Sequence, residues 1–212
     1  MRTHDKKGRA IVSAVYDSLP LFARIFIQLR LIILPLEEIE PSVPSGAIAD
    51  IGCGYGILAY YLAHTNKERT VTGFERNIAL VSRADKIALS CGLVRFVQDD
   101  AESIVLGKYD GIVLCDILHH LSPQGQEYLV RTAGKALNPR GRIIIKEIEK
   151  ERNIFYYWNL FHDRVMRLSG PTFHRTAEEW VAMVEGQAMR LIEKRHCRYF
   201  LYHHIIIVAE RA

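Results

Sequence analysis

Three glycines and an acid have the types and spacing of a binding turn for a charged small molecule. The stretch Ala49–Leu62 reads ADIGCGYGILAYYL, with Asp50 just before Gly52, Gly54 and Gly56. Glycine permits positive φ and lacks the Cβ that would keep a ligand from the backbone. A dinucleotide turn follows G-x-G-x-x-G, whereas the third glycine here comes one residue early. An acid at this point suits a cationic amine better than a pyrophosphate.

Further polar residues follow the next apolar runs of the chain. They are Glu75 and Arg76 after TVTGFE, Asp99, Asp100 and Ala101 after LVRFVQ, and Cys115 and Asp116 at the end of GIVLCD. In a doubly wound sheet, ligands bind beyond the carboxyl ends of the strands. The turn after the first strand is therefore the expected place for a ligand. The simpler alternative is a surface loop position for Glu75 and the start of a turn for Asp99.

The elements that must position these residues alternate along the chain. Five apolar strand-like runs lie at 47–51, 70–75, 93–98, 111–116 and 141–148, with helical patterns between them. Two more strand-like runs, 189–201 and 203–210, suit an antiparallel pair at the sheet edge. We therefore predict an α/β fold: a doubly wound, mostly parallel, seven-stranded sheet with an antiparallel edge strand.

The chain divides into two predicted parts. Residues 1–44 read as an N-terminal helical extension or lid, ended by the prolines of EPSVPSG. Residues 45–212 form the main domain, with an aromatic helical insertion at about 150–175.

With its motifs in this order, the sequence resembles the class I S-adenosylmethionine-dependent methyltransferases from about Ala47 onward. The resemblance rests on DIGCGYG, the acid of GFERN, QDDAES and LCDILHHL. It implies the Rossmann-like methyltransferase fold and S-adenosyl-L-methionine as cofactor, with S-adenosyl-L-homocysteine as product. The residues that it places at the cofactor are Asp50, Gly52, Cys53, Gly54, Gly56, Glu75, Arg76, Asp99, Asp100, Ala101, Cys115 and Asp116.

The roles implied by the resemblance differ along this set. Glu75 would accept hydrogen bonds from both ribose hydroxyls. Asp100, in preference to Asp99, would lie near the adenine amine, with the Ala101 amide near a ring nitrogen. The LCDILHHL segment would flank the methionine part and the transferred methyl group.

The reaction implied is an SN2 transfer of a methyl group from the sulfonium to a nucleophile, which depends mainly on alignment. A general base is needed only if the acceptor starts protonated with a high pKa. Of the adjacent His119 and His120, which cannot share one helix face, we select His120 as the inward residue, as a base or as a wall of the site. His162 is the second catalytic candidate. We expect neither a metal nor a covalent intermediate, because the sulfonium is already a strong electrophile. The sequence also contains no HExxH motif or Cys/His cluster.

The acceptor is predicted to be a small molecule. Candidate contacts are Tyr16, His162, Arg164, His174 and Arg175. The aromatic residues of the insertion suit the wall of such a site, and one buried helix face is an equal alternative. The formal net charge of +4 is too small to indicate nucleic acid by itself, and the chain lacks the Asn/Asp-Pro-Pro-aromatic segment found in many base methyltransferases.

The helical run Leu19–Leu36 has an apolar face and arginines. It would cap the site, form a dimer seam or lie on a membrane surface, in which case the acceptor would be lipophilic. Four cysteines without a CxxC pair favour buried thiols in a reducing, cytoplasmic compartment, with membrane-peripheral placement as the alternative. Two rival functions stay open: a catalytically silent domain that binds the cofactor, and an NAD-dependent oxidoreductase. The sequence indicates no oligomeric state.

Overall fold

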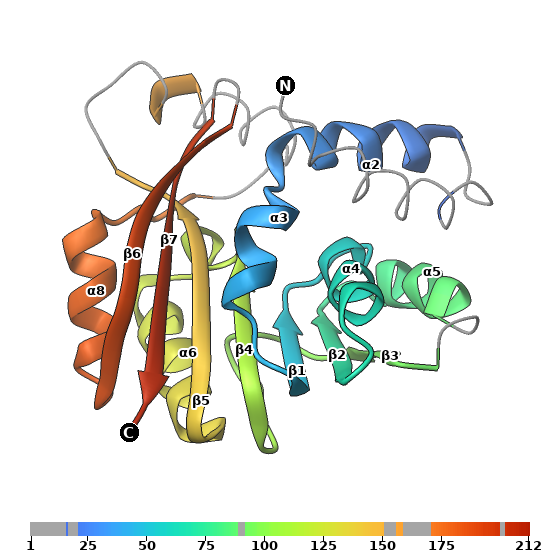
Figure 1. Ribbon diagram of the computed structural model, residues 1–212. Helices are drawn as coiled ribbons and strands as arrows, with labels where there is room; N and C mark the ends of the chain where they lie inside the picture. Colours follow the sequence, from blue (N-terminus) through green and yellow to red (C-terminus); the bar gives the residue numbers. More distant parts are fainter. Residues whose placement is uncertain (1–15, 17–20, 89–91, 151–155, 159–170, 200–201) are drawn as a thin grey trace.

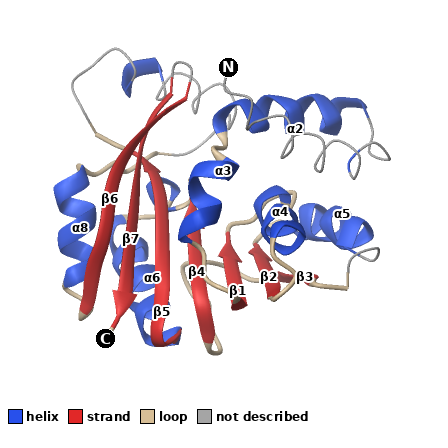
Figure 2. Cartoon of the chain, in the orientation of Figure 1, coloured by secondary structure: helices blue, strands red, loops and turns tan. Residues whose placement is uncertain are grey.

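The computed structural model describes residues 16, 21–88, 92–150, 156–158, 171–199 and 202–212. Within them, seven strands form one sheet in the order β3-β2-β1-β4-β5-β7-β6, flanked by helices on both faces (Figures 1 and 2). The parallel strands are β1 (Gly46–Ile51), β2 (Arg69–Glu75), β3 (Val94–Gln98), β4 (Tyr109–Cys115) and β5 (Leu137–Ile148). The predicted fold class is confirmed.

The reversed strand lies one place in from the edge. β7 (Tyr202–Arg211) pairs antiparallel with β5, and β6 (Met189–Tyr199) pairs antiparallel with β7. The residues from Ile205 to Ala209 in β7 are all buried, because this strand is covered on both faces. β6 carries alternate exposed charges, which suits an edge.

Local sequence signals account for the helix boundaries. Among the described residues, the main domain contains α4 (Ile57–Thr65), α5 (Ile78–Ala88), α6 (Pro123–Ala136) and α8 (Ala177–Glu185). Ser122 Oγ accepts the Gly125 amide to cap α6, with Pro123 in the first turn. Thr176 and Glu179 form a reciprocal capping box at α8.

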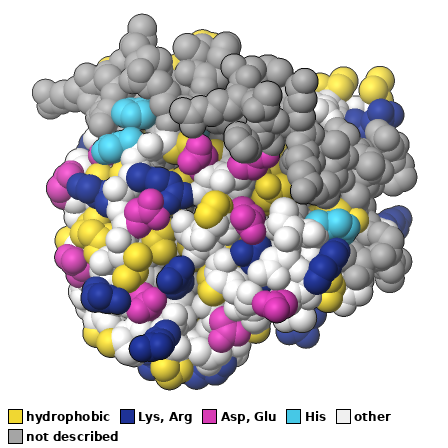
Figure 3. Space-filling view, in the orientation of Figure 1, with side chains coloured by type: hydrophobic (Ala, Val, Ile, Leu, Met, Phe, Trp, Pro, Cys, Tyr) yellow, Lys and Arg dark blue, Asp and Glu magenta, His cyan; other side chains and the backbone are white. Residues whose placement is uncertain are grey.

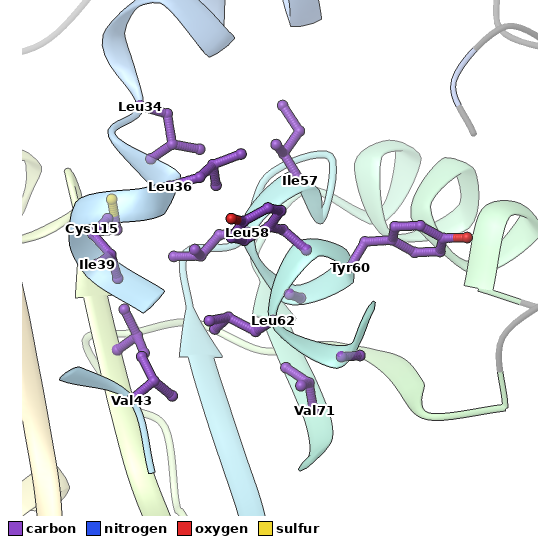
Figure 4. Packing of buried hydrophobic residues seen from close by; sticks show 14 of the residues in the cluster. Leu34, Leu36, Ile39, Val43, Ile57, Leu58, Tyr60, Leu62, Val71 and Cys115 are labelled. Carbon is purple, nitrogen blue, oxygen red and sulfur yellow. The ribbon is translucent and has the colours of Figure 1, made fainter. Parts of the chain in front are cut away.

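The described part of the N-terminal extension packs into the core of the main domain. It comprises α2 (Leu21–Ile33), α3 (Leu36–Ile39) and the short 3-10 helix η1 (Glu40–Ser42). In Figure 4, Leu34, Leu36 and Ile39 point toward Ile57 and Leu58 of α4. The segment and the sheet thus share one hydrophobic cluster, and α2 crosses above the carboxyl ends of β1 and β2 (Figure 1).

A buried arginine fixes the entry from this segment into β1. The Arg69 guanidinium donates to Glu40 Oε1 at 2.8 Å and to the Pro44 and Val43 carbonyls at 3.0 and 2.5 Å. A charge that is 4% exposed needs such partners. Arg69 therefore ties η1 and the following loop to the start of β2.

The visible surface has mixed charge. On the face in Figure 3, Lys and Arg side chains are interspersed with Asp and Glu, with no large patch of one sign. Among the described residues, no helix combines the length and apolar character needed to cross a bilayer.

Candidate active site

The glycine turn after β1 leaves one side of its backbone open. Gly52, Gly54 and Gly56 have φ values of 77°, 57° and 75°, which explains their residue type. A Cβ on Gly56 would lie 2.3 Å from Phe96 Cζ, so close packing also requires this glycine. A Cβ on Gly54 would meet no atom within 4 Å. A ligand can therefore approach the turn at Gly54.

Glu75 lies at the end of β2, next to this open side. Its Oε2 accepts the Gly54 amide at 3.1 Å, and its Oε1 accepts the Asn77 amide at 2.8 Å. Asn77 Oδ1 in turn accepts the Ala79 amide at the start of α5. The carboxylate is thus fixed between the glycine turn and a helix start, while its side chain stays partly exposed.

Asp50 is buried at the end of β1. It is 2% exposed, and its Oδ2 has no hydrogen-bond partner within the described part of the chain. Burial raises the pKa of Asp50 to about 7, against the lowering effects of the backbone at Ala59 and of Arg30. A buried oxygen of this kind is costly, and a cationic donor would relieve the cost.

The residues after β3 form a tight turn at the same edge of the sheet. Asp99 Oδ1 accepts the Asp100 amide at 2.8 Å, and Asp100 Oδ1 accepts the Glu102 amide at 3.0 Å. The Asp99 amide donates to the Glu75 carbonyl at 3.2 Å, which links this turn to the end of β2. Ala101 is buried, whereas Arg76 is exposed.

Asp116 lies directly after β4 with a φ of 53°, an uncommon conformation for a residue other than glycine. Its carboxylate accepts from Lys146 Nζ at 2.7 and 2.8 Å and pairs with Arg30 of α2 at 3.0 Å. Burial raises the pKa of Asp116, but Lys146 and Arg30 outweigh this and hold it well below its usual range. Asp116 is therefore a fixed anion, positioned where strain is often linked to function.

His119 and Glu147 form a buried dyad beside this pair. In η2 (Leu118–His120), His119 Nδ1 lies 2.5 Å from Glu147 Oε2, and the Leu118 amide donates to Glu147 Oε1 at 2.7 Å. The side chains of His119 and Glu147 are 1% and 0% exposed. His120 is more exposed than His119, and their rings lie 3.8 Å apart. The geometry therefore favours His119 over His120 as the inward histidine.

The segment before α8 brings a third imidazole to this dyad. The Phe173 amide donates to the His119 carbonyl at 2.8 Å, and the buried Gln126 amide group donates to the Phe173 carbonyl at 2.8 Å. With the backbone held by these two hydrogen bonds, the centroid of the His174 ring lies 5.2 Å from that of the His119 ring, and the two rings are nearly parallel. The Tyr156 ring meets His174 edge-on at 5.5 Å.

The other predicted acceptor contacts fall in different places. Tyr16 is buried and donates to the Tyr55 carbonyl at 2.7 Å, so it lies beside the glycine turn. Arg175 donates to Gln126 Oε1 at 2.6 Å and its guanidinium lies 5.8 Å from the Trp180 ring. His162 and Arg164 lie outside the described residues.

Sequence reasoning missed Lys146, Glu147 and Arg30. The signal for the first two was present: they interrupt IIIKEI, an otherwise apolar strand, and are 0% exposed. Two adjacent charges in a buried strand require partners at its end. Arg30 could not be found in this way, because an arginine in an amphipathic helix is usually solvated.

Comparison with known proteins gives a family match for this part of the chain. Residues 48–141 match the family model described as methyltransferase domain. This range covers the glycine turn, the ends of β2 to β4 and the His119 segment. No curated protein matches the sequence.

Similar solved structures share the fold. One is a SAM-dependent methyltransferase from Methanosarcina mazei, at 19% identity and a TM-score of 0.67 over 84% of this chain and 98% of that one. Magnesium protoporphyrin IX methyltransferase from Synechocystis, with bound SAH, is 16% identical in sequence and has a TM-score of 0.70. The match covers 98% of this chain and 96% of that one. An O-methyltransferase family 2 protein from Planctomyces limnophilus, in complex with apigenin, is 15% identical in sequence and has a TM-score of 0.70. The match covers 100% of this chain and 62% of that one.

Proposed function

We propose that the chain is a class I S-adenosylmethionine-dependent methyltransferase that transfers a methyl group to a small organic acceptor. Residues 48–141 match a methyltransferase domain family, and the chain shares the fold of S-adenosylmethionine-dependent methyltransferases. S-adenosyl-L-methionine supplies the methyl group on a sulfonium, which is already a strong electrophile. The side chains of this protein then have to bind the cofactor, orient the acceptor and accept a proton.

The observation that carries the proposal is the pair of carboxylates around the open glycine turn. Glu75 is fixed on the Gly54 amide, and the buried Asp50 Oδ2 has no hydrogen-bond partner in the described residues. A cofactor with ribose hydroxyls and a primary ammonium matches these acceptors, while the backbone at Gly54 lies open. Nicotinamide dinucleotides would instead bring a pyrophosphate toward the turn beside Asp50, and the glycine spacing also differs from theirs, which argues against the oxidoreductase alternative.

The His119–Glu147 dyad supports catalysis as well as binding. Glu147 holds Nδ1, so Nε2 of His119 is the ring nitrogen that would take a proton from an acceptor. The carboxylate would stabilise the imidazolium formed by that transfer. The dyad favours an acceptor that starts protonated, such as a hydroxyl compound. The rings of His120, His174 and Tyr156 next to it suit a planar organic molecule.

The first test is calorimetric titration of the full chain with S-adenosylmethionine, S-adenosylhomocysteine and NAD. We expect binding of both adenosyl compounds and none of NAD. The reverse result would overturn the proposal. Binding should then be followed by transfer of labelled methyl from the cofactor to a panel of small hydroxyl, amine and thiol acceptors. Binding without transfer to any acceptor would favour the catalytically silent alternative.

A lipophilic acceptor is supported by the outer face of α2. Leu21, Ile25 and Leu29 recur every fourth residue and are 70%, 50% and 45% exposed, with exposed Arg24 beside them. An apolar stripe with a basic neighbour suits the surface of an anionic membrane. The test is flotation with vesicles of anionic and of neutral lipid. Retention by the anionic vesicles, reduced in Ile25→Glu, is expected; no retention by either would remove the membrane contact.

A further inference from the structure

The buried amide of Gln126 joins three separate parts of the chain. Gln126 lies in the first turn of α6 and is 0% exposed. Its Nε2 donates to the Leu118 carbonyl at 3.0 Å and to the Phe173 carbonyl at 2.8 Å, and its Oε1 accepts from Arg175 Nε at 2.6 Å. Both N–H groups and the oxygen of the amide therefore have partners, as burial requires.

The three partners also fix the orientation of this amide. A backbone carbonyl can only accept a hydrogen bond, and a guanidinium can only donate one. The amide oxygen must therefore face Arg175, and the amide nitrogen must face the two carbonyls. The Arg175 guanidinium lies 5.8 Å from the centroid of the Trp180 ring in α8, a cation–π contact that holds it beside Gln126. Arg175 thus keeps both N–H groups of Gln126 on the two carbonyls.

The two carbonyls belong to the segments that carry the stacked imidazoles. Leu118 precedes His119 in η2, and Phe173 precedes His174. The Phe173 amide also donates to the His119 carbonyl at 2.8 Å, so the two segments contact each other directly. With both backbones bonded to Gln126, the centroids of the His119 and His174 rings lie 5.2 Å apart. The spacing of the rings therefore depends on a side chain that touches neither ring.

α6 is a firm support for this arrangement. Ser122 caps the start of the helix, and Glu102 Oε1 accepts from both the amide and the hydroxyl of Ser122, at 3.2 and 3.0 Å. Leu129 and Val130, further along the helix, are 0% exposed in the core. Gln126 is therefore fixed relative to the sheet, and the segments that it bonds take their positions from it.

We propose that Gln126, held by Arg175, is a positioning residue for methyl transfer that sets the spacing of His119 and His174 around the acceptor. This rests on the proposed function, because it assigns a residue to the acceptor side of the same site. In that reaction the acceptor gives its proton to His119 Nε2 and its electron pair to the methyl carbon, while the sulfur leaves as a thioether. Gln126 takes no part in these bonds and acts through the backbone alone. A misplacement of about 1 Å costs about 100-fold in rate.

The first test compares Gln126→Glu with the same substitution at an exposed position of the same helix. Gln126→Glu keeps the length of the side chain and an acceptor for Arg175 but removes both donors. Gln124 is exposed, so Gln124→Glu is the matched control. The full chain is assayed with labelled S-adenosylmethionine and the compound of the acceptor panel that gives the highest turnover. We expect Gln126→Glu to lower kcat about 10- to 100-fold, with S-adenosylhomocysteine affinity unchanged in both variants.

A second variant, Arg175→Met, tests the same link without removing the amide. The Gln126 side chain then keeps its donors but loses the group that orients it, so kcat should fall less than in Gln126→Met. Because the two residues act as a unit, the double variant should be no slower than Gln126→Met alone. A fall in kcat in Arg175→Met, with S-adenosylhomocysteine affinity unchanged, supports the inference even where a Gln126 variant does not fold.

A spectroscopic measurement of the ring spacing needs no acceptor. In protein with isotope-labelled histidine, the ring protons of His119 and His174 should give a nuclear Overhauser contact, because the rings are nearly parallel and close. We expect this contact in the wild type and in Gln124→Glu. It should be lost in Gln126→Glu and weakened in Arg175→Met.

An unchanged kcat in Gln126→Glu, with or without a lower thermal stability, would overturn the inference, because Gln126 would then serve the fold alone. An equal loss of kcat in Gln124→Glu would also overturn it. If the wild type transfers methyl to no acceptor, the proposed function fails. The nuclear Overhauser contact then decides by itself whether Gln126 holds the two rings.

Discussion

At the scale of single residues, buried charge is concentrated at the carboxyl ends of β1, β4 and β5. Asp116 is neutralised by Lys146, and Glu147 bonds His119 and the Leu118 amide. Asp50 differs, since one of its oxygens is buried without a hydrogen bond in the described structure. Polar groups left in this way mark sites of ligand binding more often than sites of stability.

The raised pKa of Asp50 predicts a pH-dependent affinity. The protonated form, favoured below pH 7 because the pKa is raised to about 7, cannot pair with an ammonium. Cofactor affinity should therefore fall about tenfold for each pH unit below 7. Calorimetry at pH 5.5, 6.5 and 7.5 measures this, and Asp50→Asn should give weaker binding with no such slope. A wild-type affinity that stays constant over this range would contradict the role of Asp50.

The same shift predicts an effect on the unliganded protein. Because the folded pKa lies above the unfolded one, the folded state holds the extra proton between about pH 4 and pH 7. Stability from this group is thus present at low pH and lost as the pH rises through 7. Asp50→Asn should unfold at higher urea concentration than the wild type at pH 8, and by a smaller margin at pH 5. An equal margin at both values would show that Asp50 is not perturbed.

The dyad predicts a catalytic difference between two neighbouring histidines. His119→Gln should lower kcat by about 10²- to 10⁴-fold with a protonated acceptor, the usual contribution of a general base. His120→Gln is the matched control and should have a much smaller effect. S-adenosylhomocysteine affinity, measured separately, should stay unchanged in both. A larger loss in His120→Gln would restore the choice made from the sequence.

Some residues of the candidate site could be predicted from the sequence, and others could not. The glycine turn, Glu75 and Asp116 lie at the predicted strand ends, because motif spacing and strand position determine them together. The choice between His119 and His120 depended on Glu147, a partner 28 residues away on another strand. Pairings of this kind follow from sheet register, which local sequence does not contain.

At the scale of elements, the N-terminal segment from α2 to η1 forms part of the core. Ile27, Leu31 and Ile39 are at most 1% exposed, and they share a cluster with α4 and the sheet. The sequence indicated a helical extension that would cover the site. Its depth of packing could not be predicted, because an amphipathic pattern does not say which surface it covers.

This packing predicts a stability contrast within the segment. Ile39→Ala should destabilise the protein by about 2–5 kcal/mol, because it opens a cavity between α3 and α4. Ile25→Ala, on the outer face of α2, should change stability by no more than about 0.5 kcal/mol. Urea unfolding of both variants measures the contrast. Similar small effects would mean that the segment is a detachable lid.

The charge pattern of the sequence indicates the order of the last two strands in the sheet. β7 contains IIIVA without a charge, which fits an interior strand. β6 includes Arg190, Glu193, Lys194 and Arg195, which fits an edge. The antiparallel pair could thus be predicted from the short connection, and its order from the distribution of charge.

At the scale of the whole molecule, the site joins elements from both halves of the sheet and from the N-terminal segment. Ligand binding should therefore stabilise the fold as a unit. S-adenosylhomocysteine at about 100 times its Kd adds about 2.7 kcal/mol. For a domain of this size we expect a rise in Tm of about 5–10 °C, measured by scanning calorimetry. NAD at the same concentration is the control, and an equal rise with NAD would contradict the cofactor assignment.

The place of β7 between β5 and β6 also constrains how the protein is made. A ribosome delivers β6 before β7, yet within the described sheet β6 has β7 as its single neighbour. At about 5–20 residues per second, the nascent strand must wait for that partner to emerge. Its charges and the bulge between Leu191 and Glu193 disfavour pairing with another nascent chain in that interval. The sheet is thus completed only after β6 has been synthesised, when β7 inserts beside β5 and brings Glu210 opposite Arg142.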